Sequence, residues 1–99
     1  MANTALMKAD LNDTFIFVTV GDLGSFANAA RHLGLPASTI SRRVARLERH
    51  LDLRLIRRTT RKRSLTDVGE VYFNHARREL ESIRGHQEKI NADLWTRHH

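Results

Sequence analysis

Basic side chains are concentrated in one stretch of this chain, and their chemistry suits a polyanionic partner. Residues 42–63 contain nine arginines and one lysine against only Glu48 and Asp52, which gives this segment a formal charge of +8. The whole chain carries +6, so the remaining residues sum to −2. The planar guanidinium group of arginine suits phosphate oxygens and guanine edges. The segment therefore predicts contact with nucleic acid, and the alternative interpretation is a solvated surface face.

Other kinds of chemistry find little support among the residue types. The sequence has no cysteine, which excludes disulfides, thiolate metal sites and thiol nucleophiles. Its six histidines lack the spacing with carboxylates that a metal site requires. It contains neither a Gly-rich phosphate loop nor a nucleophile elbow. We therefore expect no enzyme, no metal and no cofactor. Two alternatives to DNA binding remain: RNA, for which no aromatic stacking platform is evident, and a module that only binds another protein.

Length and composition bound the kind of molecule that carries this segment. A chain of 99 residues is too short for two independent hydrophobic cores. Its 40% hydrophobic and 28% charged residues are ordinary for a folded, soluble domain. No apolar run approaches the roughly 20 residues of a membrane span, and residues 1–10 are too polar for a secretory signal. We expect one basic domain without a membrane partner.

Two short helices are predicted before the basic segment. Asp10 is an N-cap candidate for a first helix that ends at Gly21 and buries one apolar face, formed by Leu11, Phe15, Val18 and also Ile16. Ser25 is a good N-cap for the second helix, which Gly34 closes. The apolar positions of the second helix recur at helical spacing and are Phe26, Ala29, Ala30 and Leu33.

A third helix, residues 37–50, carries the first half of the basic segment. Its apolar residues fall within about 60° of one another at 100° per residue, and they are Ile40, Val44, Leu47 and Leu51. The opposite side bears Ser38, Arg42, Ala45, Arg46 and Arg49. Two short helices joined by a Gly-containing turn, with a basic second helix facing outward, indicate a helix-turn-helix whose second helix enters the DNA major groove. The alternative is a small helical bundle with an arginine-rich surface.

The second half of the basic segment predicts a small wing. Residues 53–56 alternate between apolar and polar, as a half-buried strand does, and residues 63–65 can return beside them. Residues 59–62 form the turn, which places five basic side chains near the tip. Such a short pair of strands needs support from the helices.

A long helix is predicted from the N-cap Thr66 to about Trp95. Apolar residues recur at spacings of three and four over three heptads, with one polar member, and they are Phe73, Ala76, Leu80, Ile83, Gln87, Ile90 and Leu94. No other segment is long enough to cover this stripe, so we expect a homodimer through it; packing onto a missing domain is the alternative. The chain is thus expected to divide into a DNA-binding part, 1–65, and a dimerisation helix with the C-terminal end, 66–99.

Several segments together resemble the N-terminal domain of LysR-type transcriptional regulators. The match covers about residues 11–95 and includes FIFV (15–18), GSFANAA (24–30), Leu33, PASTISRRVARLE (36–48), LIRRTTR (55–61) and LTDVGE (65–70). Two positions depart from the family pattern: Asp52 stands where glycine is usual, and Ile56 where phenylalanine is usual.

The resemblance implies a mainly α fold, a winged helix-turn-helix followed by a linker helix that forms a homodimer. It implies binding to double-stranded DNA at an interrupted, often A/T-rich palindrome, in the cytoplasm at the nucleoid of a bacterium. It also implies a C-terminal domain that senses a small-molecule effector; this chain ends a few residues after the linker helix, so we expect the effector not to bind here.

The resemblance also assigns DNA-contacting residues. Those at the start of the third helix face base edges: Ala37, Ser38, Thr39, Ser41 and Arg42. Arg43 and Arg46 are expected to contact phosphate, and the wing residues Arg58, Arg61, Lys62 and Arg63 the minor groove or backbone. The hydroxyl groups of Ser38 and Thr39 could instead cap the helix, and Arg58 could be structural.

Overall fold

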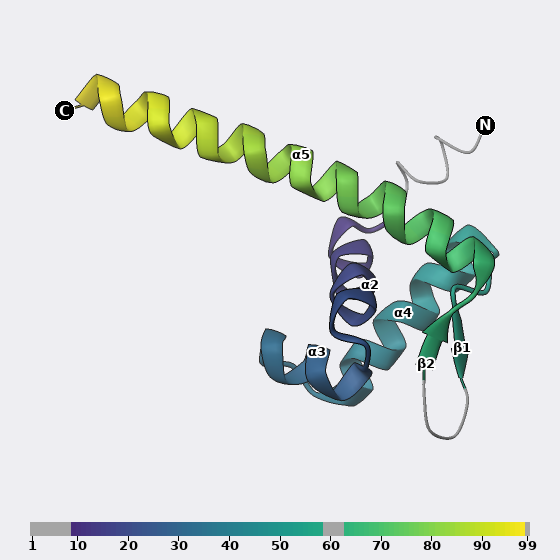
Figure 1. The fold of residues 1–99 in the computed structure, drawn as a ribbon. Coiled ribbons are helices and arrows are strands. Elements are labelled where there is room, and N and C mark those ends of the chain that lie inside the picture. Colours follow the sequence, from purple (N-terminus) through teal and green to yellow (C-terminus); the bar gives the residue numbers. More distant parts are fainter. Residues whose placement is uncertain (1–8, 59–62, 99) are drawn as a thin grey trace.

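The computed structural model describes residues 9–58 and 63–98, with side chains described within 9–57 and 65–85. Three helices, α2 (Leu11–Leu23), α3 (Phe26–Leu33) and α4 (Ala37–Leu51), pack together. A two-stranded antiparallel sheet follows, β1 (Ile56–Arg58) and β2 (Arg63–Leu65), and the chain continues into the long helix α5 (Asp67–His98) (Figure 1). This is the expected mainly α, winged helix-turn-helix architecture. No helix in the described part of the chain is long and apolar enough to cross a membrane.

Helix α2 begins as predicted but ends later and turns a different face inward. Asp10 is its N-cap, accepting a hydrogen bond from the backbone N–H of Asn12 at 2.8 Å. The predicted end at Gly21 is wrong, because Gly24 takes the left-handed conformation (φ 78°) that terminates the helix. The predicted apolar face is also partly wrong: Ile16 and Val18 are buried, whereas Leu11 and Phe15 are exposed.

Polar partners explain why α2 is oriented in this way. Its buried positions include Asp13 and Thr14, alongside the core residue Phe17. The hydroxyl groups of Thr14 and Tyr72 of α5 are 2.9 Å apart and share a hydrogen bond. Asp13 pairs with arginines of α4. Because buried polar groups with partners cost little, the helix can bury a polar edge and leave two large apolar side chains outside.

Helices α3 and α4 form as the sequence predicts. The Ser25 hydroxyl accepts from the backbone N–H of Asn28 at 3.0 Å, and Gly34 closes α3 in the left-handed conformation. The α4 stripe is buried at Ile40, Val44 and Leu47, while Leu33 of α3 and Leu51 of α4 pack against the same core and are half-buried. The structure thus confirms the helix-turn-helix.

Asp52 ends α4 in a conformation that favours glycine. Its φ is 55°, and its backbone N–H bonds to the carbonyl oxygens of Arg49 and Glu48. The turn after α4 therefore forms even though aspartate occupies the position where the resembled family usually has glycine. Beyond it, the predicted strand at 53–56 is wrong: β1 begins only at Ile56. The backbone N–H groups of Leu53 and Leu55 instead bond to Glu48, the first to its carbonyl oxygen and the second to its carboxylate.

The second strand lies where the sequence places it. Ile56 pairs with Leu65, Arg57 with Ser64 and Arg58 with Arg63. The predicted turn at 59–62 lies outside the described residues.

Helix α5 crosses α2 and then projects away from the other helices (Figure 1). Near its start, the rings of Tyr72 and Phe73 lie 5.7 and 6.3 Å from that of Phe17, centroid to centroid. Ala76 belongs to the core, and Phe73 and Leu80 pack against it. Helix α2 covers the first half of the heptad stripe, which the expectation of a homodimer along the whole stripe did not foresee.

Candidate nucleic-acid interface

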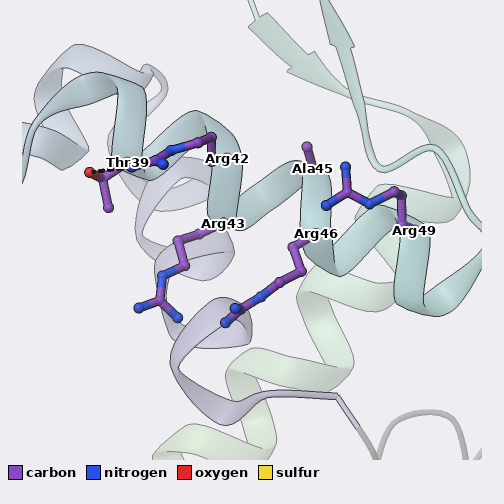
Figure 2. Close-up of a pocket in the computed structure, with 6 residues that line it drawn as sticks. All are labelled: Thr39, Arg42, Arg43, Ala45, Arg46 and Arg49. Atoms are coloured by element: carbon purple, nitrogen blue, oxygen red, sulfur yellow. Dashed lines mark hydrogen bonds between the residues drawn. The ribbon is translucent and has the colours of Figure 1, made fainter.

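The outer face of α4 is a basic surface whose direction is set by the buried stripe. Because Ile40, Val44 and Leu47 face the core, the opposite side of the helix turns outward. One surface hollow lies along this side and is lined by Thr39, Arg42, Arg43, Ala45, Arg46 and Arg49 (Figure 2). A helix is about 10–12 Å wide with its side chains, close to the roughly 12 Å width of the DNA major groove. The surface therefore has the shape and charge to enter that groove.

The arginines of this hollow point in two directions. Arg43 and Arg46 extend toward the start of α2, whereas Arg42 and Arg49 lie on the other side of α4 (Figure 2). The Nη2 of Arg42 donates to the Thr39 hydroxyl over 3.4 Å, a long bond within the same exposed face. Arg42 is thus held only weakly and stays accessible to an external acceptor.

The hydroxyl groups in the first turn of α4 do not cap the helix. Pro36 is the N-cap and provides no side-chain cap hydrogen bond. The alternative in which Ser38 and Thr39 cap the helix is therefore wrong. Ala37 and Ser38 are exposed, and Thr39 and Ser41 are half-buried, so this turn presents small residues beside Arg42.

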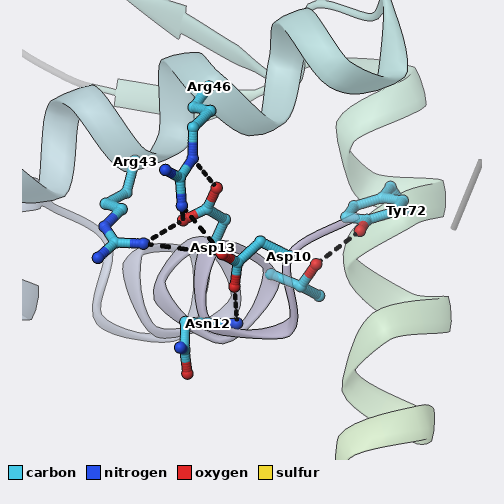
Figure 3. Close-up of polar contacts among 7 residues, drawn as sticks. Asp10, Asn12, Asp13, Arg43, Arg46 and Tyr72 are labelled. Carbon is cyan, nitrogen blue, oxygen red and sulfur yellow. Dashed lines mark hydrogen bonds and ion pairs between the residues drawn. The ribbon is translucent and has the colours of Figure 1, made fainter. Parts of the chain in front are cut away.

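Asp10, the N-cap of α2, and Asp13 within α2 bind the other two arginines, Arg43 and Arg46 of α4 (Figure 3). Arg46 donates from Nε to Oδ2 of Asp13 at 2.6 Å, and from Nη2 to Oδ1 of Asp13 at 2.9 Å and Oδ2 of Asp10 at 3.0 Å. Arg43 donates from Nη1 to Oδ1 of Asp13 at 3.1 Å and lies 3.9 Å from Oδ2 of Asp10. We call Asp10, Asp13, Arg43 and Arg46 the acid–arginine cluster.

The electrostatics of the acid–arginine cluster follow from the burial of Asp13. Its side chain is only 2% exposed, whereas those of Arg43 and Arg46 are 37% and 49% exposed. Burial raises the pKa of Asp13, but the hydrogen bonds and charges of Arg46 and Arg43 outweigh that effect and hold the pKa below its usual value. The hydrogen bond to Asp13 raises the pKa of Arg46 in turn. Asp13 and Arg46 therefore both stay charged at neutral pH.

Sequence reasoning missed the role of Asp13. The chain separations of 30 and 33 residues to Arg43 and Arg46 leave no periodic signal. Asp13 lies between Asn12 and Thr14, so its neighbours in the sequence also gave no sign that it is buried. Arg43 and Arg46 are thus expected to contact phosphate while they already donate hydrogen bonds to a carboxylate.

The wing is attached beside the end of α4 by Glu48 of that helix and by Thr66, which directly precedes α5. The Glu48 carboxylate accepts from the backbone N–H groups of Leu55 at 2.8 Å and Ile56 at 3.3 Å. Thr66 donates its backbone N–H to the Leu55 carbonyl at 3.0 Å and its hydroxyl to the Arg54 carbonyl at 2.6 Å. These bonds fix the base of the wing next to the basic face of α4.

The expected wing contacts are only partly described. Arg58 and Arg63 are register partners at the far end of the sheet, but their side chains, and all of Arg61 and Lys62, lie outside the described residues.

The predicted dimerisation residues are divided between two environments. Phe73, Ala76 and Leu80 pack within the chain itself, whereas Ile83 is 40% exposed. The side chains of Gln87, Ile90 and Leu94 lie outside the described residues, although their backbone continues α5. At Ile83 the stripe therefore leaves the core of its own chain.

Comparisons with known proteins agree with this arrangement. A family model described as bacterial regulatory helix-turn-helix protein, lysR family, matches residues 11–70. An HTH-type transcriptional regulator from Xanthomonas campestris pv. campestris (strain 8004) is 54% identical over 72 residues, which are 73% of this chain and 21% of the relative. A probable HTH-type transcriptional regulator, LtrA from Klebsiella pneumoniae, is 46% identical over 74 residues, 75% of this chain and 24% of the relative. The chain thus spans about a fifth to a quarter of these relatives.

Solved structures show the same fold. The BenM_DBD/catB site 1 DNA complex superimposes with a TM-score of 0.80 at 25% identity, covering 84% of this chain and 92% of that one. The full-length virulence activator AphB of Vibrio cholerae, a member of the LTTR protein family, gives a TM-score of 0.75 at 34% identity, covering 82% of this chain and 28% of that one.

Proposed function

Because the chain belongs to the LysR family of bacterial regulatory helix-turn-helix proteins, we propose that it binds double-stranded DNA sequence-specifically as the DNA-binding part of a transcriptional regulator. The observation that carries this proposal is the outward basic face of α4, fixed by the buried stripe on its other side. Support comes from the fold it shares with a domain solved on DNA and from relatives named as transcriptional regulators rather than enzymes.

In this proposal the start of α4 reads bases. Arg42 is the base-reading residue, because its guanidinium is exposed and only weakly held, and guanine offers two acceptors in the major groove. Ala37, Ser38, Thr39 and Ser41 line the same turn and provide a methyl group and hydroxyl groups. Arg58, Arg61, Lys62 and Arg63 of the wing bind the minor groove or the backbone beside it.

The functional unit in this proposal is a homodimer formed through α5 from Ile83 onward, with Gln87, Ile90 and Leu94 continuing the seam. Two recognition helices related by a two-fold axis bind an interrupted palindrome, and an A/T-rich spacer suits arginines of the wing. The division at residues 65 and 66 separates DNA binding from dimerisation. Such a molecule is associated with the nucleoid in the cytoplasm.

Selection of bound sites from random duplexes, followed by titration at several salt concentrations, tests the proposal. With 6–10 phosphate contacts per dimer, affinity should fall on the order of 10³–10⁵ between 50 and 200 mM salt. A palindromic consensus is the expected result. A flat salt response with no enriched site would refute the proposal.

Arg42→Ala tests the base-reading assignment. It should cost about 1–3 kcal/mol on the selected site and relax the preference at one half-site position. Arg78→Ala removes one exposed arginine from α5 and is the charge-matched control. Equal weakening by Arg42→Ala on all sequences would reduce Arg42 to a phosphate contact.

A further inference from the structure

The acid–arginine cluster poses an electrostatic problem at the edge of the proposed DNA-binding surface. Asp10 and Asp13 carry two negative charges, which cancel the charges of Arg43 and Arg46. By charge alone, the two carboxylates weaken the attraction of this edge for DNA phosphate. We therefore ask whether the two carboxylates also make a favourable contribution to DNA binding that offsets this repulsion.

The hydrogen bonds of Asp13 indicate that this contribution is the positioning of two arginine side chains. Its carboxylate is buried, and both of its oxygens accept hydrogen bonds, so that it fixes Nε and Nη2 of Arg46 together with Nη1 of Arg43. The outer parts of both guanidinium groups reach solvent. Within the described residues, Nη1 of Arg46 and Nη2 of Arg43 make no hydrogen bond and keep their donors (Figure 3).

A fixed guanidinium binds phosphate at a lower entropic cost than a mobile one. An arginine side chain loses rotamer freedom when it is immobilised against a partner. Asp13 has already immobilised both side chains when the chain folds. The loss is then not incurred again when DNA binds, which is the usual benefit of preorganisation.

We propose that Asp13 is a positioning residue for DNA binding, whose carboxylate holds Arg43 and Arg46 so that their free N–H groups face phosphates flanking the major groove. The inference rests on the proposed function and deepens it. It assigns a favourable role in DNA binding to an acidic side chain.

The sign of the effect of Asp13→Asn tests the inference. Asparagine has nearly the same shape but removes one negative charge, so electrostatic repulsion alone predicts tighter binding to DNA. Loss of positioning predicts weaker binding, by roughly 5- to 150-fold for two released side chains. It also predicts that the slope of log affinity against log salt becomes shallower by about 1–2, as phosphate contacts are lost. Glu79→Gln on the exposed side of α5 is the charge-matched control and should not weaken binding.

A folding defect must be separated from a binding defect. Circular dichroism and thermal melting establish the temperature range in which the variant is folded, and the titrations are done there. Unfolding alone lowers the active fraction but leaves the salt slope unchanged. Asp10→Asn provides a milder second variant, since asparagine is also a good N-cap and Asp10 is 43% exposed. It should weaken binding in the same direction, but less.

The outcomes separate this inference from the function on which it rests. If the unaltered chain binds no DNA site, the proposed function fails. If the unaltered chain binds a site and Asp13→Asn binds it as tightly or more tightly with an unchanged salt slope, the acid–arginine cluster serves folding only and the inference is overturned. Weaker binding with a shallower slope supports it.

Discussion

Gly69, in the first turn of α5, should be the least replaceable glycine of the described chain. A Cβ atom at this position would lie 2.0 Å from the carbonyl oxygen of Leu55 and 3.0 Å from the hydroxyl oxygen of Thr66. The same carbonyl accepts the backbone N–H of Thr66 at 3.0 Å, and the Thr66 hydroxyl accepts that of Gly69 at 2.9 Å. Gly69→Ala therefore forces the start of α5 away from the base of the wing.

The magnitude follows from three contributions. Forcing an extra methyl group into a packed site costs about 1–3 kcal/mol. Loss of the hydrogen bond from Thr66 to Leu55 adds about 1 kcal/mol. Alanine gains about 1 kcal/mol over glycine through helix propensity. The net loss is about 1–3 kcal/mol, which lowers the melting temperature of a chain this size by about 4–24 °C.

Gly85→Ala is the matched control, because it makes the same substitution in the same helix. A Cβ at Gly85 meets nothing within 4 Å among the described residues, so this variant should gain up to about 1 kcal/mol. Both variants and the unaltered chain are melted at one protein concentration, since the proposed homodimer would make the melting temperature depend on concentration. Gly85→Ala should melt at or above the melting temperature of the unaltered chain. If Gly69→Ala did the same, the close contact with Leu55 would be refuted.

Three other features of the chain give predictions that unfolding measurements can check. Asp52 ends α4 at a φ of 55°, so Asp52→Gly should raise the free energy of unfolding by up to about 1 kcal/mol, whereas Asp52→Ala should lower it. Equal changes of the two variants in urea unfolding would contradict the argument from backbone conformation. Glu48→Ala deprives the buried N–H groups of Leu55 and Ile56 of an acceptor and should cost about 1–3 kcal/mol; Glu48→Gln keeps an amide oxygen and should recover part of that cost. Because the pKa of Asp13 is lowered in the folded chain, its contribution to stability is complete above its unfolded pKa of about 3.9 and is lost as the pH falls through the lower folded value. The unfolding free energy of Asp13→Asn should therefore decline less below about pH 4 than that of the unaltered chain, and parallel profiles would count against the pairing.

Local signals in the sequence were sufficient for the helix-turn-helix. Ser25 and Gly34 cap α3 because short hydroxyl side chains and glycine have strong positional preferences at helix ends. The narrow stripe of α4 has only one side that can be buried, so its outward face, with Arg42, followed from the sequence alone. The N-cap candidate Thr66 also accepts the expected kind of bond, from the backbone N–H of Gly69.

The parts that could not be predicted depend on partners distant in the sequence. Helix α2 is apolar on several sides, so periodicity could not tell that Phe15 stays outside while Thr14 is buried against Tyr72. The alternation at residues 53–56 resembles a strand, but the backbone N–H of Leu55 donates to the Glu48 carboxylate, and strand pairing begins only after it. Asp13 meets its arginines only because α2 packs across α4.

The hydrogen bonds of Thr66 to the carbonyl groups of Arg54 and Leu55 tie the start of α5 to the base of the wing. With 32 residues, α5 is about 48 Å long, so a tilt of about 5° at its first turn displaces its far end by roughly 4 Å. The first half of α5 also packs on α2 through Tyr72, Phe73 and Ala76, so a sideways force on its far end acts on the helical core as well as on the base of the wing. The base of the wing and the far end of α5 are therefore joined by one continuous path of contacts through Thr66.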